Sequence, residues 1–149
     1  MENNYRHRVV SWWSSGKTGL SKSDSAPNAI HFAAPPEFGG LQGRWTPEDL
    51  LMCALASCFT TTFHAIAGNS KFEFTDLEVE SEGTVSKTSS GYTFTQITIR
   101  PTLTILGDHY RDRGIALLEK AKELCLVSRA LAIAPAFESS IVVGKQQPA

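Results

Sequence analysis

Two cysteines stand in local contexts that suit thiol chemistry. Cys58 lies in the segment Ala56-Ser57-Cys58-Phe59, which is apolar and has helical periodicity, and Cys125 lies on a second such segment. A thiolate attacks electrophiles, and a second thiol close by can close a disulfide with the oxidised sulfur. If the fold brings the two helices together, the chain has a reactive thiol and a resolving thiol, which is the minimum that a thiol peroxidase needs.

Each cysteine also has a structural interpretation. Free cysteine is among the most buried residue types, so Cys58 and Cys125 could simply fill space in the core. Cys53 lies five residues before Cys58, on a different face of the helix, and we expect it in the core. A metal site of Cys53, Cys58 and His64 is not expected, because the helix directs Cys53 away from the other two.

The length and composition of the chain exclude several classes of protein. With 149 residues, of which 42% are hydrophobic, the chain is long enough for one domain over residues 1–149 and short for two. A net charge of −1 provides no broad basic surface for nucleic acid. We find no run of about 18 apolar residues that would span a membrane. Residues 1–8 lack the apolar stretch of a secretory signal, and three cysteines do not suit a secreted disulfide framework, so we expect a cytoplasmic protein.

The strongest helix signal surrounds Cys58. Thr46 is a good N-cap and Pro47 suits the first helical position, whereas Gly68-Asn69 is typical of a helix end. Apolar residues recur at steps of three and four between these signals, so we expect a central and mostly buried helix. The members of this apolar face are Leu51, Leu55, Cys58, Phe59, Thr62, Phe63 and Ile66.

Strand patterns flank this helix on both sides. Before it, residues 9–13 and 29–33 are rich in β-branched and aromatic residues. After it, residues 77–85 alternate in polarity and residues 92–105 return as a long strand, in which Pro101 predicts an edge or a bulge. A second helix over residues 111–126, with Ile115, Leu118, Leu124 and Cys125 on one stripe, a short helical turn at 128–131 and a last strand at 139–143 complete the order. This order is typical of an α+β fold with an antiparallel sheet.

The ordered set of motifs resembles a known family, the osmotically inducible protein C and organic hydroperoxide resistance proteins (OsmC/Ohr). Three segments match the family's loop, helix start and first cysteine: Phe38-Gly39-Gly40, Thr46-Pro47-Glu48-Asp49-Leu50-Leu51 and Ala56-Ser57-Cys58-Phe59. The segment 121–131 resembles the second-cysteine motif, closest to the OsmC-like branch, with Leu126 where a proline is common.

The resemblance implies an OsmC-like fold, in which antiparallel sheets wrap around central helices in an intertwined homodimer. It also implies a cofactor-free reduction of organic hydroperoxides. In that chemistry Cys58 becomes a sulfenic acid, Cys125 forms a disulfide with it, and an external dithiol of the lipoyl or thioredoxin type restores both thiols.

The resemblance makes Glu48 the carboxylate that orients a cation beside Cys58. Ten helical residues separate Glu48 from Cys58, a rise of about 15 Å, so we expect Glu48 to serve the cysteine of the partner subunit. Cys58 lies about three turns into its helix, too far for the helix dipole to activate it, so a neighbouring cation is expected. Lys17 and His31 stand where family members carry an arginine, and Arg44 is the third candidate.

Two other hypotheses remain at this point. The protein could be an OsmC-like protein without efficient peroxidase activity that binds a small apolar or thiol-bearing ligand at the dimer interface. It could also be a structural dimer whose cysteines only pack, in which case Cys58 would resist alkylation in the folded chain.

Overall fold

The structure is a computed structural model and describes residues 3–144. The chain forms two compact units, one ending at Leu51 and one beginning at Met52. Helix α1 (Pro47–Asn69) begins in the first unit and continues through the second. Each unit is described by itself below, and the expected single domain over residues 1–149 stays a prediction.

The first unit contains a three-stranded antiparallel sheet in the order β1-β2-β3. Its strands are β1 (Val9–Ser15), β2 (Thr18–Ser23) and β3 (Ile30–Ala33), and a short 3-10 helix, η1 (Pro36–Phe38), follows. Two of these strands match the sequence patterns, whereas β2 was not assigned because Thr18-Gly19 resembles a turn. Gly19 is instead a packing glycine, since a Cβ at this position would collide with the Phe32 ring.

The start of α1 confirms the predicted N-cap. Thr46 and Asp49 exchange two hydrogen bonds: the Thr46 N–H donates to the Asp49 carboxylate at 3.1 Å, and the Asp49 N–H donates to Thr46 Oγ1 at 3.0 Å. This reciprocal arrangement satisfies backbone donors that a helix start otherwise leaves free. Glu48 takes no part in the exchange, so Asp49 is the capping partner of Thr46.

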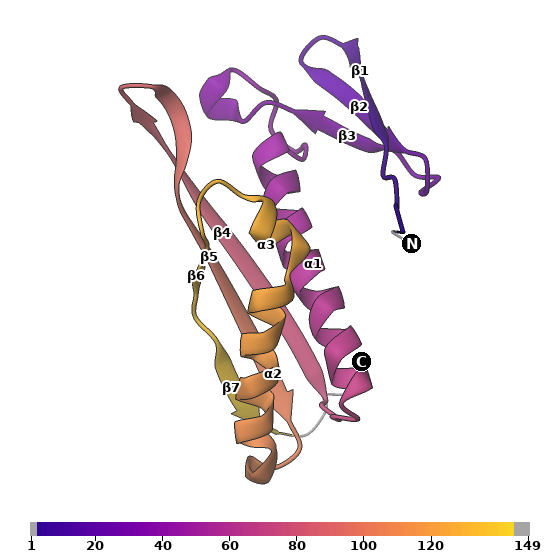
Figure 1. The fold of residues 1–149 in the computed structure, drawn as a ribbon. Coiled ribbons are helices and arrows are strands. Elements are labelled where there is room, and N and C mark those ends of the chain that lie inside the picture. The colour runs from indigo at the N-terminus through magenta and orange to yellow at the C-terminus, as the bar shows by residue number, and fades with distance from the viewer. Residues whose placement is uncertain (1–2, 145–149) are drawn as a thin grey trace. The chain divides into compact units, whose positions relative to one another are not determined.

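The second unit is organised around a long antiparallel hairpin of β4 (Asp76–Thr88) and β5 (Gly91–Ile105). Two short strands, β6 (Ala136–Phe137) and β7 (Ser140–Val143), pair in parallel with the other side of β5. The expected antiparallel sheet is therefore present, with parallel strands added at its second edge (Figure 1).

Pro101 corrects one expectation from sequence. Its strand, β5, is central, and the bulge of this strand lies at Thr95, opposite Thr84 and Val85 of β4 and away from Pro101. Along the edge of β5 that faces β6 and β7, Ile99 pairs with β6 and Thr102 pairs with β7. Pro101 falls between these two pairings, where the ladder requires no N–H, so a central strand tolerates it.

Both helices of the second unit cover the same face of the sheet (Figure 1). The core joins α1, β5 and α2 (Arg111–Leu124), and α2 is preceded by η2 (Asp108–Tyr110) and followed by α3 (Leu126–Ala130). Burial of each large apolar side chain contributes about 1.5–3 kcal/mol. The fully buried large side chains are Leu55, Phe59, Phe63, Ile97, Ile99, Pro101, Leu103, Ile105, Leu118 and Cys125.

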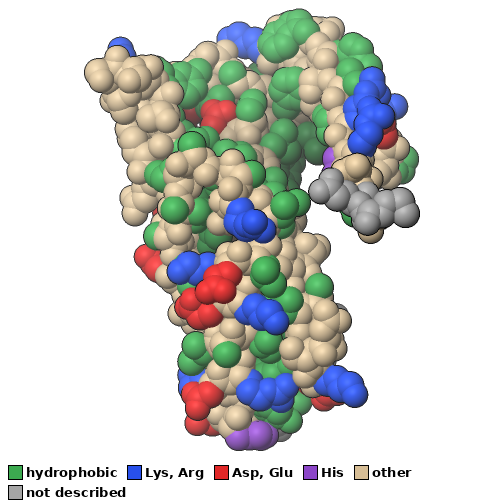
Figure 2. Space-filling view, viewed as in Figure 1, with side chains coloured by type: hydrophobic (Ala, Val, Ile, Leu, Met, Phe, Trp, Pro, Cys, Tyr) green, Lys and Arg blue, Asp and Glu red, His purple; other side chains and the backbone are tan. Residues whose placement is uncertain are grey.

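The buried face of α2 differs from the predicted stripe. Gly114, Leu117, Leu118 and Ala121 are buried, but Ile115 and Leu124 are 43% and 46% exposed. The apolar stripe is thus narrower than predicted, and its close approach to the sheet uses Gly114, where a Cβ would lie 3.0 Å from Leu103 Cδ2. The outer face of this helix carries Lys, Arg and acidic side chains side by side (Figure 2).

Helix α1 is less buried than the sequence predicted. Its mean hydropathy reaches 1.6 over 18 residues, of which 28% are buried, so by length and composition alone it could cross a membrane. This corrects the statement that the chain lacks such a segment. The buried face packs on the sheet of its own unit, as a core helix does, while the exposed residues form a stripe at steps of three and four. Between the two ends of the helix they are Cys53, Ser57, Thr61, His64, Ala65 and Gly68.

Candidate active site

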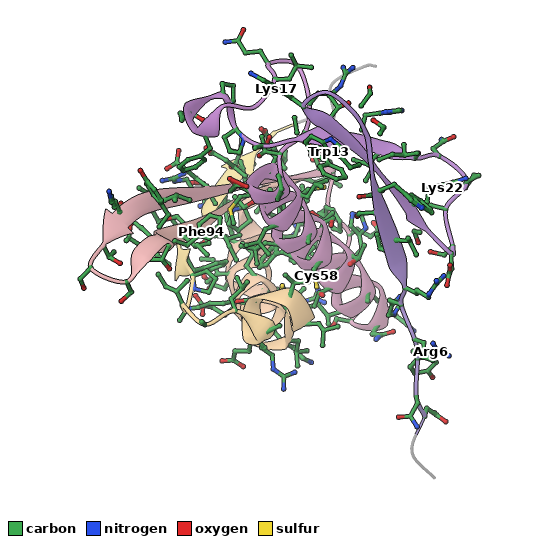
Figure 3. All side chains as sticks on the ribbon, turned by 90° about the horizontal axis from the view of Figure 1, so that it is seen from above. Arg6, Trp13, Lys17, Lys22, Cys58 and Phe94 are labelled. Carbon is green, nitrogen blue, oxygen red and sulfur yellow. The ribbon has the colours of Figure 1, made fainter. Side chains whose placement is uncertain are left out.

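The structure brings Cys58 and Cys125 together. Cys58 projects from α1 on the side that faces α3, and it is partly buried (Figure 3). Cys125 is fully buried at the break between α2 and α3, and its thiol is hydrogen-bonded to the Cys58 side chain. Neither cysteine forms a disulfide in this structure. Disulfide formation requires two thiols that lie close together.

The break between α2 and α3 explains why Cys125 lies there. Cys125 has an extended backbone, with φ −62° and ψ 112°, so it ends α2 and caps α3. Its carbonyl accepts a hydrogen bond from the Arg129 N–H at 3.2 Å. The first N–H groups of α3 have no partner within the helix, which leaves them free to face the two sulfur atoms.

These donors lower the pKa of the Cys58 thiol. Partial burial alone would raise this pKa, but hydrogen bonds from the Val127 N–H, the Cys125 thiol, the Thr62 hydroxyl and the Leu126 N–H outweigh the burial. Each of them stabilises the thiolate more than the thiol. Cys58 is therefore the sulfur that holds a negative charge more readily.

Cys125 behaves in the opposite way. Burial raises the pKa of its thiol, and the Cys58 sulfur raises it further, through a hydrogen bond and through its negative charge. The N–H groups of Ser128 and Val127 oppose this effect without reversing it. When the pair loses one proton, these opposite shifts favour the thiolate at Cys58 over the thiolate at Cys125.

The other predicted residues lie in the first unit. Glu48 is in the first turn of α1 and is half-buried, Arg44 precedes the N-cap, His31 is on β3, and Lys17 is in the turn between β1 and β2. The last three are exposed. Their approach to Cys58, within one chain or across two, stays a prediction.

One expectation about the site is wrong, and a second, the cation beside Cys58, stays a prediction. Cys53, expected in the core, is exposed, because it lies on the side of α1 away from the sheet. A cation was expected to be the activator of Cys58, but the second unit already supplies neutral donors from α3 and from Thr62. Sequence reasoning missed these donors. The spacing of four between Cys58 and Thr62 was the available signal, since such residues are neighbours on a helix.

Potential metal ligands are not grouped around the thiols. In residues 3–144, three or more His, Cys, Asp or Glu side chains do not gather in a way that could hold a metal ion. The arrangement that the structure does show is a partly buried thiol whose pKa is lowered, beside a fully buried thiol whose pKa is raised.

Comparison with protein families identifies the family of this chain. The family model of OsmC-like proteins matches residues 40–140, which include both Cys58 and Cys125. The chain belongs to the OsmC-like family. The OsmC/Ohr resemblance noted from the motifs is confirmed.

Individual OsmC-like relatives are similar over most of the chain. The uncharacterized protein YmaD of Bacillus subtilis is 29% identical over 122 residues, which cover 80% of this chain and 81% of the relative. Peroxiredoxin OsmC of Escherichia coli is 27% identical over 117 residues, which cover 78% and 80%. A crystal structure of an organic hydroperoxide resistance protein OsmC from Legionella pneumophila has a TM-score of 0.72 at 24% identity and covers 95% of this chain and all of that chain. The structural likeness confirms the OsmC-like fold.

Proposed function

We propose that this OsmC-like protein is a thiol-dependent peroxidase that reduces organic hydroperoxides to alcohols in the cytoplasm. The observation that carries the proposal is the opposite pKa shift of two cysteines in contact, lowered for Cys58 and raised for Cys125. A peroxidase needs this asymmetry, because the attacking sulfur must be a thiolate, whereas the resolving thiol must react only after the first cysteine has been oxidised.

The proposed cycle has three steps. The Cys58 thiolate attacks the terminal peroxide oxygen, the O–O bond breaks, and the alkoxide takes a proton to leave as the alcohol, so that Cys58 becomes a sulfenic acid. Cys125 then attacks that sulfur, forming the Cys58–Cys125 disulfide and releasing water. An external dithiol of the lipoyl or thioredoxin type then reduces this disulfide by thiol–disulfide exchange. Both cysteines return to thiols, and the dithiol is oxidised to a disulfide. No cofactor takes part.

The proposal includes an intertwined homodimer. The exposed stripe of α1 supports it, because only 28% of the residues in the most apolar 18-residue window of this helix are buried within one chain. Short side chains such as Cys53, Ser57 and Thr61 allow a second helix to approach closely. A dimer would let Glu48 of one subunit orient a cation beside Cys58 of the other, with Arg44, His31 and Lys17 as the candidates. Because Asp49 serves as the capping partner, the Glu48 carboxylate is available for this role.

A second function rests on the source of the Cys58 pKa shift. The donors that lower it are neutral groups of the same unit, whereas a fast peroxidase also needs charge to stabilise the leaving alkoxide. Without a cation at the site, the same thiolate would bind a small apolar or thiol-bearing ligand at the dimer interface and react slowly with peroxides.

Stopped-flow kinetics separates the two functions. Pre-reduced protein is mixed with cumene hydroperoxide or with hydrogen peroxide. The mass of the intact protein chain is then measured by mass spectrometry. The peroxidase predicts fast consumption, selective for the organic peroxide, and a loss of about 2 Da per chain as the disulfide forms. Slow consumption with unchanged mass would contradict it and leave ligand binding.

A further inference from the structure

Thr62 is placed differently from the two threonines that precede it on α1. Thr60 donates its hydroxyl to the Ala56 carbonyl at 2.8 Å, and Thr61 donates to the Cys58 carbonyl at 3.1 Å. These are the usual bonds of threonine inside a helix. Thr62 Oγ1 instead lies 4.0 Å from Cys58 Sγ, one turn along the same face.

We propose that Thr62 is a positioning residue for Cys58: its hydroxyl donates a hydrogen bond to the Cys58 sulfur and holds the thiolate in the orientation from which it reacts. The direction of the bond follows from the chemistry, because a thiolate has no hydrogen to give and the hydroxyl must donate. The inference rests on the proposed function in taking Cys58 as the attacking thiol.

The surroundings of the sulfur explain why one more donor is useful. The Cys58 sulfur faces Cys125 and the start of α3 on one side, and all of these donors belong to a segment other than α1. Thr62 belongs to the same helix as Cys58, so its bond does not depend on how α3 packs against α1. A β-branched side chain also has few rotamers in a helix, which keeps the hydroxyl in place.

Among residues 3–144, the titratable side chain that acts on the Cys58 pKa is the Cys125 thiol, and burial raises the pKa of that thiol. Removing the Thr62 hydroxyl therefore leaves the Cys58 sulfur with the donors of Cys125, Leu126 and Val127 alone in this unit. Because one hydrogen bond of this kind changes the balance between thiol and thiolate modestly, we expect a shift in the Cys58 pKa of about half a unit.

The test compares Thr62→Val, which keeps the side-chain shape and loses the hydroxyl, with Thr62→Ser, which keeps the hydroxyl. Thr60→Val is the matched control, since it makes the same change at another half-buried position of α1. The full-length, pre-reduced chain is alkylated with iodoacetamide across a pH series. Peptide mass spectrometry then follows Cys58 separately from Cys53 and Cys125.

Thr62→Val is expected to move the midpoint of Cys58 alkylation up by about half a pH unit, which lowers the thiolate fraction about threefold below the midpoint. Thr62→Ser and Thr60→Val are expected to keep the wild-type midpoint. Equal shifts for Thr62→Val and Thr60→Val, or no shift for Thr62→Val, would overturn the proposal. Thr62→Ala replaces Thr62→Val if the valine variant does not fold.

Peroxide consumption is measured on the same variants. If the wild type consumes no cumene hydroperoxide, the proposed peroxidase fails, while the alkylation profiles still decide whether Thr62 serves Cys58. If the wild type is active, Thr62→Val is expected to slow the reaction about threefold near neutral pH. At high pH, where Cys58 is ionised in the wild type and in the variant alike, the two rates are expected to approach each other. A rate deficit that stays constant with pH would contradict a role through the thiolate.

Discussion

The surroundings of Cys58 and of Cys125 differ although the two sulfur atoms are in contact. Cys58 lies within a continuous helix and is partly exposed, whereas Cys125 lies at a helix break and is fully buried. The donors at the start of α3 serve both, but burial dominates at Cys125 and hydrogen bonding dominates at Cys58. The same residue type thus acquires two chemical characters from small differences in solvation.

Replacing each cysteine in turn is the strongest test of the different roles proposed for Cys58 and Cys125. Cys58→Ser is expected to reduce cumene hydroperoxide consumption by at least about a hundredfold, because the nucleophile is lost. Cys53→Ser makes the same replacement on an exposed face of α1 and is expected to keep the wild-type rate. Stopped-flow traces of both variants check this, and full activity in Cys58→Ser would refute the assignment.

Cys125→Ser is expected to allow one turnover and then stop. Cys58 would still be oxidised, but without a resolving thiol its sulfenic acid would persist. Intact mass after one equivalent of peroxide is expected to show a gain of about 16 Da that a dimedone trap captures. Sustained turnover in this variant, with no trapped sulfenic acid, would show that another thiol resolves Cys58.

The pH dependence of alkylation compares the pKa values of the Cys58 and Cys125 thiols in the unmutated protein. Because the pKa of Cys58 is lowered, its thiolate persists below the ordinary thiol value of about 8.5, and its alkylation rate falls only when the pH drops through the lowered pKa. The raised pKa of Cys125 delays its alkylation until above the ordinary value. Peptide mass spectrometry after iodoacetamide treatment measures both.

Denaturant provides the control for these profiles. In the unfolded chain the two cysteines lose their different surroundings, so their alkylation midpoints are expected to converge. Midpoints that coincide already in the folded chain would contradict the asymmetry.

Leu126→Pro tests the donors at the start of α3. Leu126 is the first helical residue after the Cys125 cap, a position that suits proline, so the fold should be kept. Proline has no N–H, and one donor to the Cys58 sulfur would be lost. We expect the alkylation rate of Cys58 at pH 7 to fall about twofold to threefold.

Leu126→Ala is the matched control, because it shortens the exposed side chain and keeps the N–H. Equal rates in the proline and alanine variants would mean that this N–H contributes nothing to the Cys58 thiolate.

The smallest effect is expected at Arg100, on the opposite face of the sheet. Arg100 forms ion pairs with Glu80 and Glu82 at 3.4 Å and with Glu138 at 3.0 Å, all involving exposed carboxylates. Such surface pairs contribute little to stability. Arg100→Gln is expected to lower the melting temperature slightly and to leave the alkylation of Cys58 unchanged, which thermal unfolding and mass spectrometry check. A change in Cys58 reactivity would show coupling through the sheet.

Much of this fold follows from local patterns. The helix that carries Cys58 was predicted with its cap at Thr46 and its end at Gly68-Asn69, because capping and periodicity depend on neighbouring residues. The long hairpin was predicted for the same reason. The parallel pairing of β6 and β7 was not, because it depends on partners far away in the sequence.

For the candidate site, the sequence by itself singled out Cys58, Cys125 and the family motifs around them. The tertiary structure decided that the pKa values of the two thiols shift in opposite directions. The reason is physical: 67 positions separate the cysteines along the chain, and a pKa depends on burial and on donors within a few ångströms. Only the packing of α3 against α1 sets both of these.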